Sequence, residues 1–571
     1  MATNLLVGGY TCPHVTANNV DERDQKTPDD WIPRHPDLIR LTGRHPFNCE
    51  PPLPKLAEHG FITPVSLHYV RNHGPPPKLD WDTHKIKIDG AVNNPVELSM
   101  NDLLTKFEQI TMPVTLVCAG NRRKEQNMHK QGIGFSWGAA GLGTSVWTGV
   151  RLRDVLDYCG IKSWSEGAKH VCMGGADWLP GGGGSYYATS ITRHVAMDWD
   201  AQNVILAWEQ NGQRLTPDHG YPIRVVIPGY IGGRMIKWLT YITVTEQEDS
   251  THYHYHDNRV LPPGIDAERA IAERWWYKPE YIINDLNINS AITSPGHDEI
   301  VTLMSGAVGT YKCKGYAYSG GGRKVTRVEL SFDEGVTWDL CTLNHPERPT
   351  PAGKHWCWCF WEFDVPYMRL LRSKQMMVRA WDTGLNTQPM NFTWNVMGMM
   401  NNCTFKVRIH DLKEPVVPGG LSLQFEHPTQ AGQLPGGWMV PKQTEEATPA
   451  AAPAKKVEDK PTAAAKASTK YFTEEEVAKH TEKDDCWFIY NGKVYDATSY
   501  MDDHPGGAES ILLVAGEDAT EEFDSLHSEK ARNLLEQYCI GEVGAGEVGT
   551  SDESLLPAEE TLYEKLGGEG A

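Results

Sequence analysis

A single cysteine followed by two arginines is the first group of residues that could do chemistry. Cys118 ends an apolar run, and Arg122 and Arg123 follow it in "TLVCAGNRRKEQN". A thiolate beside fixed positive charge is a good metal ligand or nucleophile, and an arginine fork binds oxyanions. A buried structural cysteine followed by a solvated turn is the competing interpretation. These residues alone leave both interpretations open.

Two histidines near the carboxyl end form a second group. His504 precedes a Pro-Gly-Gly turn, and His527 follows Phe523 by one helical turn. The glycines let a large flat ligand approach the backbone, and the aromatic ring shares a helix face with the imidazole. Two imidazoles on opposite sides of a haem give an iron that transfers electrons without binding substrate. For either histidine taken alone, an ordinary surface position is the alternative.

The elements that position these groups fall into several domains, as expected for 571 residues. "HKIKIDG" alternates with period 2, "RLRDVLDYCG" has one apolar helical face, and "VELSFDEGVTW" predicts a strand followed by a turn. "PKQTEEATPAAAPAKKVEDKPTAAAKASTK" contains no aromatic residue, which is typical of a flexible linker. We predict a leader (1–60), a mixed α+β domain (61–263), a β-sandwich (264–410), a linker (411–469), a small α+β unit (470–545) and a second hinge (546–571).

Charge and composition limit the class of partner. The net charge is −20, which argues against nucleic acid and against an anionic membrane surface. No apolar run is long enough to cross a membrane, and the first residues lack the features of a secretory signal. The 12 cysteines are scattered and form no CxxC pair, so reduced thiols and a cytoplasmic location are expected.

The carboxyl-terminal unit resembles the cytochrome b5 family. The similarity lies in "HPGG", "FDSLHS" and the upstream "DDCWFIYNGKVYDATSY" and spans roughly 470–543. The resemblance implies haem b with His504 and His527 as its axial ligands. It also implies an acidic rim for docking redox partners, for which a solvated acidic surface is the alternative; the rim would consist of Asp502, Asp503, Glu517, Asp518, Glu521 and Glu522.

The region from about 60 to 410 resembles the sulfite oxidase family, most closely its eukaryotic nitrate reductase branch. The similarity lies in the Cys118 stretch and in "YVRNHG", "GFSWGAAGLGTSVWTGVRL", "DHGYPIRVVIPGYIGGRMIKWL" and "HYHYHDNRVLPP". It implies a molybdopterin domain with Cys118 as the protein thiolate on molybdenum, and an Ig-like sandwich that forms a homodimer. The implied pterin contacts are Arg71, Asn72, His73, Asp177, His219, Arg224, Met235, Ile236 and Lys237.

The resemblance also implies the substrate. Arg71 and Arg123 would hold nitrate, whose acceptor oxygens suit two guanidinium groups. Asn258 and Met397 stand where sulfite oxidases carry a tyrosine and an arginine, which favours nitrate over sulfite. Trp137 corresponds to a pocket residue of the family, or it is plain core. The expected activity is nitrate reduction; the alternatives are a sulfite oxidase-type enzyme and a non-catalytic electron carrier or scaffold.

The expected electron source lies outside this sequence. Members of the nitrate reductase branch continue into a flavin (FAD) and nicotinamide reductase region, so a reductase domain or partner would supply electrons from NAD(P)H. The last residues, "TLYEKLGGEGA", resemble the first helix of truncated haemoglobins, with an amphipathic linker helix as the alternative.

Overall fold

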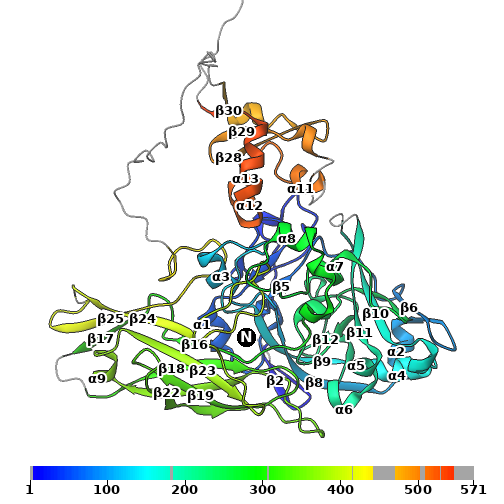
Figure 1. Cartoon of the computed structure of the whole chain (residues 1–571), viewed down its shortest axis with the longest axis horizontal. Helices are drawn as coiled ribbons and strands as arrows, with labels where there is room; N and C mark the ends of the chain where they lie inside the picture. The colour runs from blue at the N-terminus through cyan, green and yellow to red at the C-terminus, as the bar shows by residue number, and fades with distance from the viewer. Residues whose placement is uncertain are drawn as a thin grey trace, which may run out of the picture.

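A computed structural model of the chain describes residues 4–179, 184–304, 308–414, 416–440, 470–501, 504, 508–527 and 529–544. Figure 1 shows two broad β-rich regions side by side, with a smaller unit in orange and red above them. Within the described residues, no helix is both long enough and apolar enough to cross a membrane.

The first large region contains two five-stranded sheets. One has the order β11-β10-β15-β6-β7, and the other has β13-β12-β9-β8 with β14 beside β12. The predicted alternation of "HKIKIDG" is confirmed, because Ile86 and Ile88 of β6 are both buried. The strands are β6 (Lys85–Gly90), β7 (Val96–Ser99), β8 (Gln109–Val117), β9 (Leu142–Arg151), β10 (His170–Leu179), β11 (Ser185–Thr192), β12 (Ile205–Gln210), β13 (Gln213–Arg214), β14 (Arg224–Val226) and β15 (Leu239–Thr245).

Short helices connect these strands. The predicted helix in "RLRDVLDYCG" is confirmed as α4, which buries its apolar side and is followed by Gly160 with φ +66°. Helix α3 begins directly after the Cys118 loop, and α7 carries the "HYHYH" stretch. The helices of this region are α1 (Leu53–Glu58), α2 (Met100–Lys106), α3 (Arg123–His129), α4 (Leu152–Tyr158), α5 (Arg193–Met197), α6 (Trp199–Gln202), α7 (His252–His256) and α8 (Ala267–Ala272).

The first 60 residues are integrated into this region, although an extended leader was expected there. Strands β1 (Leu5–Val7) and β2 (Tyr10–Cys12) form a hairpin, and β3 (Ile39–Arg40), β4 (Asn48–Glu50) and β5 (Val70–Arg71) form one sheet across position 60. Arg34 is buried between three carboxylates, those of Asp24, Asp29 and Asp218, at 2.8–3.0 Å. Pairing and charge, rather than apolar periodicity, therefore fix this segment, which is why the sequence pattern did not show it.

The second large region is a sandwich of two antiparallel sheets, as predicted. Their orders are β16-β18-β22-β21 and β17-β25-β24-β23-β19-β20. The sandwich was expected to end at position 410, but strand β25 lies beyond it. Because β25 pairs with both β24 and β17, it belongs to the sandwich. The elements are β16 (Asn289–Ser294), β17 (Ile300–Met304), β18 (Thr310–Tyr318), β19 (Val325–Ser331), β20 (Asp339–Leu340), β21 (Thr342–Asn344), β22 (Cys359–Pro366), α9 (Tyr367–Leu370), β23 (Gln375–Asp382), β24 (Phe405–Leu412) and β25 (Gly420–Glu426).

The smaller unit combines a five-stranded sheet, β26-β30-β29-β28-β27, with short helices. In Figure 1 the lower end of α12 stands next to the blue amino-terminal segment. The elements are β26 (Tyr471–Phe472), α10 (Glu474–Val477), β27 (Thr481–Glu482), β28 (Asp485–Tyr490), β29 (Lys493–Asp496), α11 (Ala508–Leu512), α12 (Thr520–Leu526), α13 (Glu529–Leu535) and β30 (Cys539–Val543). The predicted segments at 441–469 and 546–571 and the rim residues Asp502 and Asp503 lie outside the described residues.

Candidate functional site

Cys118 lies where strand β8 ends and the chain turns toward helix α3. Its side chain is buried, and the backbone N–H of Gly120 donates to Sγ at 3.4 Å. Burial raises the pKa of the thiol, while Arg123, the Gly120 N–H and Arg71 act in the opposite direction. A bound metal ion would displace the thiol proton outright. The site therefore provides a protected sulfur ligand with positive charge already beside it.

The two adjacent arginines have different destinations. Arg123 lines the same cavity as Cys118, and it donates to the carbonyl groups of Phe135 at 3.1 Å and Gly398 at 3.3 Å. A Cβ at Gly120 or Gly134 would lie 2.5–2.6 Å from the Arg123 guanidinium, so a larger residue at either position would displace that group. These contacts hold the guanidinium in place before any anion arrives.

Arg122 instead ties the cavity region to the sandwich. It has φ +67°, pairs with Glu125 at 2.8 Å, and donates to Asn289 at 2.9 Å and to the carbonyl of Cys403 at 2.7 Å. All of these contacts are buried. Arg122 is therefore a structural residue, whereas the sequence pattern could not separate it from Arg123.

A wall of polar side chains faces the cavity from several segments. Asn72 donates to Asp218 at 3.0 Å and accepts from Lys237, whose ammonium also donates to the Asp218 carbonyl at 3.0 Å. Burial lowers the pKa of Lys237 and raises the pKa of Asp177. Burial likewise lowers the pKa of Arg224 to about 10. Each shift reports an ionisable group held away from water.

Several buried polar atoms of this wall lack a hydrogen-bond partner within the protein. They are Asp177 Oδ1, His219 Nε2 and Arg224 Nε, and all three residues line the cavity of about 210 Å³. Orphaned buried donors and acceptors cost about 1–3 kcal/mol each, so their gathering around one cavity indicates a polar ligand. Together with the thiol, this donor set fits a pterin cofactor that carries a thiolate-bound metal.

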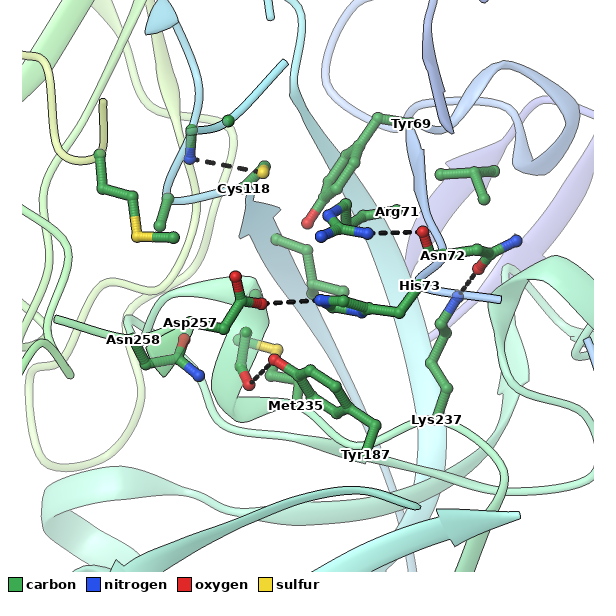
Figure 2. Close-up of a pocket in the computed structure, with 18 of the residues that line it drawn as sticks. Tyr69, Arg71, Asn72, His73, Cys118, Tyr187, Met235, Lys237, Asp257 and Asn258 are labelled. Carbon is green, nitrogen blue, oxygen red and sulfur yellow. Dashed lines mark hydrogen bonds and ion pairs between the residues drawn. The ribbon is translucent and has the colours of Figure 1, made fainter. Parts of the chain in front are cut away.

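His73 and Asp257 form a pair on the opposite side of the cavity (Figure 2). His73 Nε2 lies 2.7 Å from Asp257 Oδ2, and the imidazole packs against the Tyr187 ring with centroids 4.5 Å apart. Burial lowers the pKa of His73 to about 4. Burial alone would raise the pKa of Asp257, but His73, Arg71 and Arg123 more than offset it and lower that pKa. The carboxylate is therefore ionised and faces the space between Cys118 and Arg71.

Sequence reasoning missed both Asp257 and Tyr187. Asp257 precedes Asn258 in "HYHYHDNRV", so the family resemblance covers its segment but does not point to this residue. Tyr187 donates to the Gly233 carbonyl at 2.9 Å and lines the cavity. Nothing in the local pattern of β11 distinguishes this tyrosine from a core residue.

The structure brings together most of the predicted residues. The cavity is lined by Cys118, Arg71, Asn72, His73, Arg123, Asp177, His219, Arg224, Met235, Lys237, Asn258 and Met397. Ile236 and Trp137 are fully buried and stand outside this lining. Trp137 packs edge-on against Tyr69 and beside Phe135, so any effect it has on the cavity passes through those rings.

The smaller unit brings its two histidines close together, with their ring planes inclined at 37°. The ring centroids of His504 and His527 are 5.9 Å apart, and a cavity of about 530 Å³ adjoins both. Metal–imidazole bonds are about 2 Å long, so this spacing suits one metal ion between the rings. His527 Nδ1 lies 3.1 Å from the Phe523 carbonyl, to which it can donate, leaving Nε2 for the metal. The flanking Phe523, Ile511, Val514 and Leu535 provide the apolar walls that a haem needs.

Comparisons with known proteins agree with this division. Residues 73–253 match the family described as oxidoreductase molybdopterin binding domain, and residues 280–412 match the Mo-co oxidoreductase dimerisation domain. Residues 473–544 match the cytochrome b5-like heme/steroid binding domain. A solved structure of the sulfane dehydrogenase SoxCD from Paracoccus pantotrophus is 22% identical, covers 66% of this chain and 86% of its own, and has a TM-score of 0.50, which shows the shared fold.

Curated relatives are much more similar in sequence. "Nitrate reductase [NAD(P)H]" of Hordeum vulgare is 56% identical over 524 residues, which are 92% of this chain and 58% of that protein. "Nitrate reductase [NADH]" of Petunia hybrida is 55% identical over 92% of this chain and 57% of its own length. The chain thus spans less than two thirds of the length of these relatives.

Proposed function

We propose that the chain reduces nitrate to nitrite, as a member of the eukaryotic nitrate reductase family, whose molybdopterin-binding, dimerisation and cytochrome b5-like domains it carries. The observation that carries this proposal is the buried cavity in which Cys118 faces Arg71 and Arg123. A small anion would find two guanidinium groups there, beside the only thiol that lines the cavity among the described residues.

The residues of the cavity would divide the work between holding the cofactor and holding nitrate. Cys118 would bind molybdenum, and Asn72, Asp177, His219, Arg224 and Lys237 would hold the pterin. When bound, this cofactor supplies oxygen-atom transfer and electron storage. Arg71 and Arg123 would orient nitrate and stabilise the negative charge on the departing nitrite. Positioning and electrostatics are the contributions of the protein.

Two neutral side chains support nitrate over sulfite as the substrate. Asn258 and Met397 line the cavity, and the family resemblance implies that they stand where sulfite oxidases carry a tyrosine and an arginine. The amide nitrogen of Asn258 donates to the Tyr253 carbonyl at 3.2 Å, which fixes its orientation. A methionine in place of an arginine leaves the cavity with fewer positive charges, which suits a singly charged anion better than a doubly charged one.

The smaller unit (470–544), called the haem unit from here on, would deliver electrons one at a time. His504 and His527 would hold the haem, which would supply one-electron transfer rather than substrate binding. The names of the relatives support NADH or NADPH as the ultimate donor, and an FAD-containing reductase region or partner would pass these electrons on. The dimerisation domain supports a homodimer.

The test is nitrite formation by the molybdenum-loaded chain with a chemically reduced viologen. We expect nitrite from the unaltered chain and none from Cys118→Ser, with Cys159→Ser, at the buried residue that directly follows α4, as a matched control that keeps activity. Sulfite oxidation without nitrite formation would favour the sulfite oxidase alternative. A chain that holds molybdenum but turns over neither substrate would favour the carrier or scaffold alternative.

A further inference from the structure

The haem unit touches the rest of the chain through a short basic loop. Arg44 Nη1 lies 2.6 Å from Glu517 Oε2, and Arg44 Nε lies 3.9 Å from Glu522 Oε1. A Cβ on Gly43, which has φ +65°, would lie 2.6 Å from Glu522 Cγ, so the two surfaces meet at backbone distance. We propose that residues 43–46, the docking loop, are the surface on which the haem unit docks to pass electrons to the cavity of Cys118.

The docking loop is held rigidly by a buried ionic network. Arg40 pairs with Asp24 at 2.7 Å and donates to the backbone carbonyl of Arg44 at 3.1 Å. His45 Nδ1 lies 3.3 Å from Asp29, which also accepts from Arg34. The Asp24 and Asp29 side chains are fully buried. These buried ion pairs explain why a segment without apolar periodicity is folded. They also fix the backbone of the docking loop, from which the exposed Arg44 side chain projects.

The docking loop lines the haem cavity, which shares the residue His73 with the cavity of Cys118. The haem cavity is bounded by Arg44, His45 and Pro46 on one side and by His504 and His527 on the other. His73 lines both the haem cavity and the cavity of Cys118. Its ring packs 4.5 Å from Tyr187 and 5.3 Å from Tyr253, so an aromatic cluster fills the space between the two sites. Docking at Arg44 therefore brings the haem cavity against His73, which also lines the cavity of Cys118.

The strength of the contact suits a reversible encounter. The Arg44 and Glu517 side chains are 41% and 46% exposed, so their ion pair is screened by salt and weak on its own. The haem unit is covalently joined to the sandwich through residues 441–469, so docking is intramolecular and needs little affinity. Exposed charge pairs of this kind mainly set the rate and orientation of an encounter. The interface can therefore also release the haem unit toward its electron donor.

Cross-linking tests the position of the haem unit without any turnover. In Arg44→Lys, a carbodiimide would join the introduced amine to a carboxylate in contact with it, and mass spectrometry would identify the joined peptides. We expect links from position 44 to Glu517 or Glu522 that disappear at high salt. Arg153→Lys is the matched control, because Arg153 is equally exposed and its neighbours are Asp154 and Asp157 of its own helix. Links from position 44 to other carboxylates only would overturn the proposal.

Charge reversal tests the consequence for electron transfer. In Arg44→Glu, re-oxidation of pre-reduced haem by nitrate should slow about tenfold at low salt, and Glu517→Arg in the same chain should restore most of the rate. Arg153→Glu should leave the rate unchanged. Equal rates in Arg44→Glu and the unaltered chain would overturn the docking role. This inference rests on the proposed function only for its kinetic part, since cross-linking does not depend on nitrate and can fail or succeed separately.

Discussion

The two cofactor cavities are built in opposite ways. The haem cavity comes largely from one compact unit, in which His527 and Phe523 are one helical turn apart and stack at 4.0 Å. The cavity of Cys118 draws on strands, loops and helices from residue 68 to residue 399. One of its arginines is held from the sandwich side, because Arg123 donates to the Gly398 carbonyl. A carrier site can thus be a local module, whereas the catalytic site depends on the packing of two large regions.

The largest effect on stability is expected at Arg122, the buried arginine between the two large regions. Arg122→Ala should destabilise the large regions by about 3–5 kcal/mol, because it leaves the buried Glu125 without its cation. Urea unfolding followed by tryptophan fluorescence would measure the loss, with the haem absorbance as an internal control. Loss of haem at the same urea concentration would mean that the units do not fold separately.

The neighbouring arginine should affect rate rather than stability. Arg123→Ala should lower kcat/KM for nitrate by about 10²–10³, the usual cost of removing one oriented donor from a charge-stabilising site. Steady-state nitrite formation with a reduced viologen would measure this, and Arg123→Lys should recover part of the rate. A variant that unfolds like Arg122→Ala while keeping full activity per folded molecule would reverse the roles assigned to the two arginines.

Buried neutral histidines should make the large regions sensitive to acid. Burial lowers the pKa of His427 from 6.5 to about 4. Because the folded pKa is the lower one, its contribution is complete above pH 6.5 and is lost as the pH falls toward 4, by about 2 kcal/mol between pH 7.5 and pH 5. His427→Gln, which can still donate to the Pro295 carbonyl, should flatten this dependence in urea unfolding at the two pH values. An unchanged slope would assign the acid sensitivity to other groups.

The smallest effect is expected inside the haem unit. Phe523→Leu removes the stacked ring beside His527 but keeps an apolar wall, so haem retention should weaken by about 0.5–1.5 kcal/mol. Transfer of haem to an excess of apo-myoglobin would measure this, and nitrite formation with a viologen should stay unchanged. A large loss of nitrite formation in that assay would show that the cavity of Cys118 depends on the haem cavity.

Sequence patterns predicted the local features well. The strand with Ile86 and Ile88, helix α4 and the sandwich strands were all expected, because each depends on periodicity within one short segment. The closeness of His504 and His527 was expected from the resemblance to the cytochrome b5 family. Most of the predicted cavity residues also gathered around one space. Their individual roles stay predictions, since gathering alone does not show what each residue binds.

Residue types and short-range patterns identified the groups that could do chemistry and the stretches that form each local element. Only the tertiary structure decided that Arg123 enters the cavity while Arg122 leaves it, that His73 meets Asp257, and that the first 60 residues carry a docking loop. The physical reason is the distance along the chain over which each kind of interaction acts. Helix and strand periodicity acts between near neighbours, whereas buried ion pairs and orphaned polar atoms arise only when segments far apart in the chain pack together.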